Sequence, residues 1–291
     1  MTLTAKPLHE LFAAELSGVP LSGHMSPAEL AEIKAALAQY AVCAVGHDQP
    51  LSNEDHIAFS ALLGPIEGGK ILKVSGSPDE MRIAHHEIID QSNMDETGEI
   101  YADDDRRLAF KRANRLWHTD MSFHQNRATW SLLSAHMVPP DGAPTEFSDM
   151  RAVYDALPDG MKTRIDGLEA EHSYWHSRVL GGGPEPTDEE RASRPPARHK
   201  LVHVHEPSGR KALYIASHAT HIVGWPEDEG RDLLLELMEF ATRPEFVYSH
   251  DWRVGEVVIW DNLCTIHRAT EFDDRQYRRD MRRTTCRESA V

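Results

Sequence analysis

Blocks of apolar residues alternate with polar ones and divide the first quarter of the chain into helix, strand and helix. A helix is predicted over about 26–40, where Ser26 and Glu29 form a capping box and Pro27 takes the first helical position. The apolar run AVCAV at 41–45 predicts a short buried strand. A second capped helix is predicted from about 51 to 63.

The second half of the chain is richer in apolar runs of strand length. Helical patterns are confined there to short pieces within 150–170 and to a helix at about 228–241. Many short strands with few peripheral helices predict one β-rich domain over 1–291, a jelly-roll core carrying helices. Strands are predicted over 129–138, 142–149, 201–206, 211–216, 245–250, 255–262 and 277–286.

Two segments lack a regular pattern. Residues 66–115 show weak periodicity, and the charged stretch at about 75–112 predicts a long loop. A long loop beside a reactive motif often serves as a lid. The Gly- and Pro-rich stretch at about 180–198 predicts an inserted loop within the domain, because strand-like segments resume directly after it.

Charge and cysteine content narrow the class of protein. The formal net charge of −16 argues against binding nucleic acid or an anionic membrane, but a few buried basic groups could still bind a small anion. No apolar run approaches the ~20 residues of a membrane helix, and the first residues lack a signal-peptide pattern. Cys43, Cys264 and Cys286 are widely spaced and typical of free thiols. A cytoplasmic protein is expected.

The stretch LWHTDMSF at 116–123 contains the most reactive pattern in the chain. His118 and Asp120 stand two apart, so in an extended segment their side chains point the same way. Alone, such a pair is more often a structural hydrogen bond than a metal site. His267, which follows the buried run VVIW, adds a third donor. Two histidines and one carboxylate are typical of non-haem Fe(II) sites with open coordination positions.

A run of arginines near the C-terminus predicts an anion-binding strand. Arg279 and Arg283 are four apart, so both would point to one side of a strand, with Arg278 and Arg282 on the other. Guanidinium groups bind carboxylates through paired hydrogen bonds. A hairpin between the strand of His267 and this strand would bring the inward arginines beside the metal.

These motifs resemble the Fe(II)/2-oxoglutarate dioxygenases of the taurine and 2,4-dichlorophenoxyacetate type over nearly the whole chain. The resemblance implies a double-stranded β-helix and iron bound by His118, Asp120 and His267. It implies further that Thr145 and Arg279 bind 2-oxoglutarate. The motifs that carry the resemblance are NRLWHTDMSF, PPDGAPTEFSDMRAVYDALP, GRKALYIASHATHI, WDNLCTIHRAT and RRDMRR.

The family pattern also implies a site for an anionic aromatic substrate. Arg283 would meet the anionic head, and a lysine after the EGG segment would assist it, with Lys73 favoured over Lys70. His205 and His218 are more often structural, and His218 is the better candidate for a contact. Other candidates to line the pocket are Asn114, Trp117 and Phe123.

The expected reaction is hydroxylation of the methylene next to the carboxylate of an aryloxyacetate such as 2,4-dichlorophenoxyacetate. It would use Fe(II), 2-oxoglutarate and O2, with ascorbate as an activator in vitro, and would release a phenol and glyoxylate with succinate and CO2. The resemblance also suggests a homo-oligomer. Open alternatives are a taurine or alkylsulfonate dioxygenase, a zinc or manganese hydrolase with the same three donors, and a non-catalytic β-barrel.

Overall fold

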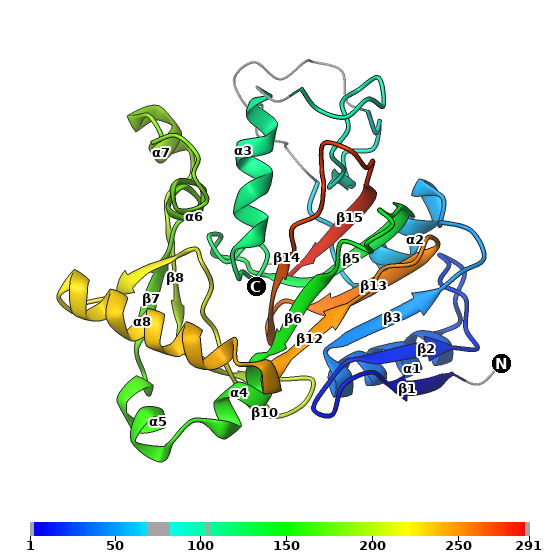
Figure 1. Cartoon of the computed structure of the whole chain (residues 1–291). Coiled ribbons are helices and arrows are strands. Elements are labelled where there is room, and N and C mark those ends of the chain that lie inside the picture. Colours follow the sequence, from blue (N-terminus) through cyan, green and yellow to red (C-terminus); the bar gives the residue numbers. More distant parts are fainter. Residues whose placement is uncertain (1–2, 69–81, 103–104, 289–291) are drawn as a thin grey trace.

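A computed structural model describes residues 3–68, 82–102 and 105–288. Lys70 and Lys73, and part of the predicted lid, lie outside these residues. The described chain is mainly β-sheet with helices around it (Figure 1). Within the described ranges, no helix is long and apolar enough to cross a membrane.

The largest sheet has seven strands in the order β1-β2-β3-β13-β5-β15-β4. Its central strand β13 is buried at every position, as the run EVVIWD requires of a strand covered on both faces. All neighbouring strands are antiparallel except β2 and β3. The strands are β1 (Thr4–Pro7), β2 (Ala14–Ser17), β3 (Val42–Gly46), β13 (Glu256–Asp261), β5 (Ala128–Met137), β15 (Asp280–Arg287) and β4 (Ile89–Asp90).

Three smaller sheets are found among the described residues, in the orders β12-β6-β14, β11-β7-β8 and β10-β9. The first of them carries His267 on β14 and lies next to the large sheet (Figure 1). The strands are β12 (Val247–His250), β6 (Thr145–Asp149), β14 (Thr265–Ala269), β11 (Ala219–Ile222), β7 (Glu169–His172), β8 (Ala197–Lys200), β10 (Arg210–Leu213) and β9 (Val202–His205).

The helices begin where the sequence supplies caps. The Ser26 side chain accepts from the backbone N–H of Glu29, and the Glu29 carboxylate accepts from the backbone N–H of Ser26, which confirms the predicted capping box. Ser52 caps α2 in the predicted place. The helices are α1 (Pro27–Tyr40), α2 (Asn53–Leu63), α3 (Arg106–Arg112), α4 (Met150–Ala156), α5 (Asp159–Ile165), α6 (Tyr174–Leu180), α7 (Asp188–Ser193), α8 (Glu227–Ala241), and the 3-10 turns η1 (Ala113–Arg115) and η2 (Pro244–Phe246).

Apolar side chains fill the space between the two sheets that carry the candidate residues. Phe147 of β6 packs edge-on against Trp260 of β13 with ring centroids 5.6 Å apart, and Leu133 and Val258 belong to the same buried cluster. A second cluster joins α1 and α2 to the large sheet, and a third joins α4, α5 and α8 to the smaller sheets. The strands β5, β13 and β14 are therefore fixed in place by close packing in the buried core.

Two segments predicted as loops contain helix. Residues 106–112 form α3, whose N-cap Asp105 accepts from the backbone of Arg107. Residues 188–193 form α7, which has a second capping box between Thr187 and Glu190. Both helices are short and rich in charge, so the apolar period that would have predicted them is absent. Local capping, rather than an apolar face, marks where they begin.

Candidate metal and cosubstrate site

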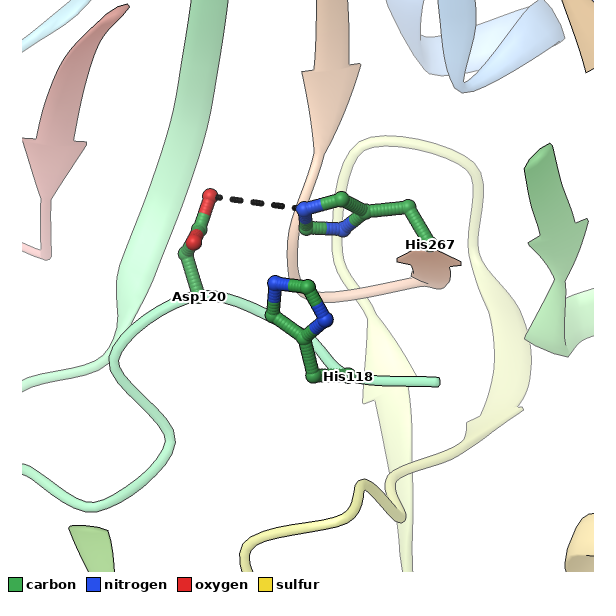
Figure 2. Close-up of side chains that lie close together, drawn as sticks. All are labelled: His118, Asp120 and His267. Atoms are coloured by element: carbon green, nitrogen blue, oxygen red, sulfur yellow. Dashed lines mark ion pairs between the residues drawn. The ribbon is translucent and has the colours of Figure 1, made fainter. Parts of the chain in front are cut away.

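His118, Asp120 and His267 lie together in a buried cluster. Their ligand atoms are all within 4.8 Å of one another. The exposed fractions of the three residues are 7%, 4% and 5%. Figure 2 shows the carboxylate and the two imidazole rings turned toward one another. The prediction that the side chains of His118 and Asp120 point the same way is confirmed.

Backbone pairing sets the two histidines opposite each other. His118 and His267 form an isolated antiparallel bridge, with N–H···O distances of 2.9 and 2.7 Å. Their ring centroids are 4.2 Å apart. Met121, directly after Asp120, has a φ of 56°, a left-handed conformation that side chains with a Cβ rarely adopt. This turn ends the extended segment immediately after the carboxylate.

An Asx turn starts the strand of His267. The carboxylate of Asp261, at the end of β13, accepts the backbone N–H of Leu263 at 2.8 Å, and Thr265 donates its hydroxyl to the Asp261 carbonyl. The chain therefore reverses between β13 and β14 within a few residues. His267 then packs against Trp260, with ring centroids 4.7 Å apart.

The protonation states suit a divalent metal. Burial lowers the pKa of His118 and of His267, so both rings are neutral and can offer a lone pair. His118 Nδ1 lies 2.7 Å from the Leu116 carbonyl, so Nδ1 carries the proton and Nε2 is left for a ligand. Burial alone would raise the pKa of Asp120, but Arg283, His267 and His118 hold it well below its usual range.

The predicted hairpin between the His267 strand and the arginine strand is wrong. β14 pairs with β6, whereas β15 pairs with β5 and β4 in the large sheet. Arg283 nevertheless reaches the centre from across the sheets, and its Nη1 lies 2.5 Å from Asp120 Oδ1. Arg282 is largely covered and pairs with Asp280, while Arg278 is exposed and pairs with Glu99.

Arg279 is a buried cation for which the described part of the chain supplies no ion pair. Its exposed fraction is 8%, and its Nε has no hydrogen-bond partner among the described residues. Burial lowers its pKa to about 10, so it remains charged at neutral pH. Asn93 fixes its backbone, accepting the Arg279 N–H at 2.7 Å. A buried unpaired charge is costly, and an anionic ligand would compensate it.

Three further predicted residues, Thr145, His218 and Asn114, have different neighbours. Thr145 is buried on the face of β6 that it shares with Phe147, whose ring stacks on His267 at 6.0 Å. His218 lies edge-on to His118 at 6.2 Å and contacts the Ser122 hydroxyl at 3.0 Å. Asn114 donates its amide to Gln91 at 3.1 Å.

The aromatic candidates Phe123 and Trp117 are packed against other side chains, and His205 is held by hydrogen bonds. Phe123 packs on His218 at 5.0 Å, next to the centre. Trp117 packs against the helical core with Arg268 over its ring. His205 forms a second cluster with Asp261 and Cys264, but Asp261 and Ser208 occupy its two ring nitrogens at 2.8 and 2.7 Å. His205 is therefore structural, as expected.

Two polar side chains at the centre were not predicted from the sequence. Ser131 and Asn262 both contact the Asp120 segment. Ser131 and Asn262 both lie within predicted strands, at 129–138 and 255–262, so neither stood out as a candidate. Both are polar residues at strand positions that the sequence pattern predicts to be buried, and this could have identified them as candidates.

A buried histidine near the centre predicts acid sensitivity. Neither ring nitrogen of His172 has a hydrogen-bond partner within the described ranges, and burial lowers its pKa to about 3, with His199 adding to the shift. The unfolded chain, with a pKa near 6.5, binds the proton first, so stability is full above pH 6.5 and falls toward pH 3. Between pH 7 and 5 this histidine alone should remove about 2 kcal/mol of unfolding free energy.

Urea unfolding at pH 7 and at pH 5 measures this loss. The variant His172→Leu should show a smaller decrease between the two pH values than the unmodified protein. An equal decrease in both proteins would show that His172 does not carry the effect.

Two neutral imidazoles and one carboxylate are the ligand types typical of non-haem Fe(II) sites. Among the described residues, Arg279 is a buried cation without an ion pair, which suits an anionic cosubstrate. The family comparison agrees, because residues 4–285 match the model described as "Taurine catabolism dioxygenase TauD, TfdA family". The chain belongs to this family. It is a 2-oxoglutarate-dependent non-haem iron dioxygenase that uses Fe(II), 2-oxoglutarate and O2, which removes the hydrolase and the non-catalytic barrel as alternatives.

Relatives match along the whole chain. The chain is 44% identical over 291 residues to the alpha-ketoglutarate-dependent 2,4-dichlorophenoxyacetate dioxygenase of Cupriavidus pinatubonensis, covering 100% of both proteins. It is 34% identical to the (S)-phenoxypropionate/alpha-ketoglutarate-dioxygenase of Sphingobium herbicidovorans, covering 94% of this chain and 91% of the relative. The crystal structure of AAD-2 in complex with Mn(II) and N-oxalylglycine matches with a TM-score of 0.92 and 40% identity, covering 99% of each chain.

Proposed function

We propose that this enzyme hydroxylates the methylene carbon next to the carboxylate of an aryloxyacetate such as 2,4-dichlorophenoxyacetate. The hydroxylated product is a hemiacetal that breaks down to a phenol and glyoxylate. The observation that carries the substrate class is the 44% identity over the full chain to a 2,4-dichlorophenoxyacetate dioxygenase. A taurine dioxygenase has less support, since this family also includes enzymes for sulfur compounds but the relatives named for them are less identical.

His118, Asp120 and His267 would bind the iron. All three donors are buried within 4.8 Å of one another, and no thiolate of the described residues joins them, which suits Fe(II) better than a structural zinc ion. When bound, Fe(II) and 2-oxoglutarate together supply the O2-dependent oxidation, in which 2-oxoglutarate becomes succinate and CO2. The protein's part would be to supply these three donors and leave other coordination positions to the cosubstrate and O2.

Arg279 and Thr145 would bind 2-oxoglutarate. The unpaired guanidinium of Arg279 supplies the positive charge that the distal carboxylate requires, in a buried position where such a pair is strong. Thr145 already accepts a hydrogen bond from Trp252 Nε1 at 3.0 Å, so its hydroxyl proton is free to be donated to a ligand oxygen. The neighbouring structure of AAD-2 contains N-oxalylglycine, a close analogue of 2-oxoglutarate.

Arg283 would bind the carboxylate of the primary substrate, assisted by His218, Asn114 and Lys73. Arg283 already contacts Asp120 through Nη1, so a substrate anion bound by its other N–H groups would lie close to the metal position. Such a tether would present the neighbouring methylene to the reacting centre. Phe123 and His218 offer an aromatic wall next to His118, which fits an aryl ring better than taurine.

The seven-stranded sheet and the β12-β6-β14 sheet support a jelly-roll core, because they meet across the buried Phe147–Trp260 contact. We propose further that residues 1–291 form one cytoplasmic catalytic domain that assembles as a homo-oligomer. The segments at about 75–112 and 180–198 would serve as a lid and as an insertion of this domain.

Competing substrates test the assignment. Purified enzyme with Fe(II), ascorbate, 2-oxoglutarate and O2 should release phenol from 2,4-dichlorophenoxyacetate with a kcat/KM at least about 100-fold above that for sulfite release from taurine. A preference for taurine, with succinate formed in step with sulfite, would keep the iron chemistry and overturn the aryloxyacetate assignment.

A further inference from the structure

The carboxylate of Asp120 is held from two sides. Its Oδ1 accepts from Arg283 Nη1 at 2.5 Å, and its Oδ2 accepts the Ser131 hydroxyl proton at 2.7 Å. Ser131 lies on β5 and is completely buried. Of the two carboxylate oxygens, Oδ2 is the one that faces the metal donors, since it lies 3.9 Å from His267 Nε2. The serine therefore contacts the oxygen nearest to the metal position.

Asn262 sets the direction of that hydrogen bond. Its Nδ2 donates to Ser131 Oγ at 3.0 Å, so the serine accepts from the amide and its single proton is left for Asp120. The amide itself cannot flip without loss, because its Oδ1 accepts from Asp120 N–H at 3.1 Å and from Trp260 Nε1 at 3.0 Å. Asn262 is completely buried.

Asn262 also joins the two segments that carry the metal donors. It lies in the connection between β13 and β14, five positions before His267. The Thr119 hydroxyl, between the other two donors, donates to the Asn262 carbonyl at 2.7 Å. The segment of His118 and Asp120 and the segment that leads to His267 are therefore joined through Asn262.

We propose that Ser131 and Asn262 are positioning residues that orient the Asp120 carboxylate for the metal, an inference that rests on the metal site of the proposed function. Fixed outer partners keep a ligand from rotating away from the ion and are worth about 10- to 100-fold in metal affinity. Without the serine hydroxyl, Oδ2 loses its donor, and among the described residues Arg283 is the remaining side chain that donates a hydrogen bond to the carboxylate. The carboxylate would then be free to turn toward that guanidinium.

Co(II) titration of the metal-free protein tests the proposal without relying on turnover. The variant Ser131→Ala removes one oxygen from β5, and Ser134→Ala is its matched control, because Ser134 is equally buried on the same strand and its hydroxyl lies next to His136. We expect Ser131→Ala to weaken Co(II) binding by about 10- to 100-fold and to change the Co(II) absorption spectrum. Ser134→Ala should bind Co(II) as the unmodified protein does.

The melting temperatures of the metal-free proteins distinguish a loss of Asp120 positioning from a general loss of stability. Similar melting temperatures for the two serine variants, with weaker Co(II) binding in Ser131→Ala alone, would support the proposal. Equal Co(II) affinity in both variants would overturn it and leave the metal site standing. Failure of the unmodified protein to bind Co(II) would instead refute the metal site, and the positioning role with it. Asn262→Ala should weaken Co(II) binding at least as much as Ser131→Ala.

Discussion

Replacing His118 with alanine should reduce succinate formation by more than about 100-fold. Loss of a single outer partner of a metal ligand already costs 10- to 100-fold, and loss of a ligand should cost more. His118 is buried, neutral and opposite His267, so no side chain can move into its place without disturbing the bridge between the two strands. Succinate release and bound iron should both be measured.

His124→Ala is the matched control, because His124 lies in the same segment but is exposed. It should retain both iron and succinate formation. Full iron content and full turnover in His118→Ala would show that the metal is bound elsewhere.

Replacing Arg279 with alanine should raise the KM for 2-oxoglutarate by about 30-fold or more. Truncating one partner of a buried charge pair usually costs 2–5 kcal/mol. The apoprotein should not be destabilised, because Arg279 has no ion pair within the described residues and its removal takes an unpaired charge out of the interior. Iron affinity should stay unchanged, which distinguishes this effect from that of His118→Ala.

Arg278→Ala provides the comparison for this result. Arg278 is the preceding residue, but it is exposed and pairs with Glu99 at the surface. Its replacement should leave the KM for 2-oxoglutarate near that of the unmodified enzyme. Equal KM values in the two arginine variants would contradict the role proposed for Arg279.

The sequence predicted that His118, Asp120 and His267 lie together, because their pattern is local and chemically specific. His118 and Asp120 stand two apart in an extended segment, and His267 follows a buried strand closely. The predicted strands at 129–138 and 255–262 correspond to β5 and β13, since mainly apolar stretches of strand length are typical of buried strands.

What the sequence did not predict depends on pairing between distant segments. The arginine strand follows His267 closely, which suggested a hairpin, yet β14 and β15 belong to different sheets. The contact between Arg283 and Asp120 is therefore made across the sheets. Ser131 and Asn262 escaped notice for the same reason, because their hydrogen bonds join residues more than ten positions apart. Helix α3 was missed because its sequence, RRLAFKR, is too short and too charged to show a helical period.

The central claim is that oxidation of an aryloxyacetate is coupled to conversion of 2-oxoglutarate at one iron centre. The most direct test is the molar ratio of phenol to succinate formed from 2,4-dichlorophenoxyacetate by the iron-loaded enzyme, with and without 2-oxoglutarate. We predict equal amounts of the two products, and neither product when 2-oxoglutarate is omitted. Phenol released at an undiminished rate without 2-oxoglutarate would contradict the account.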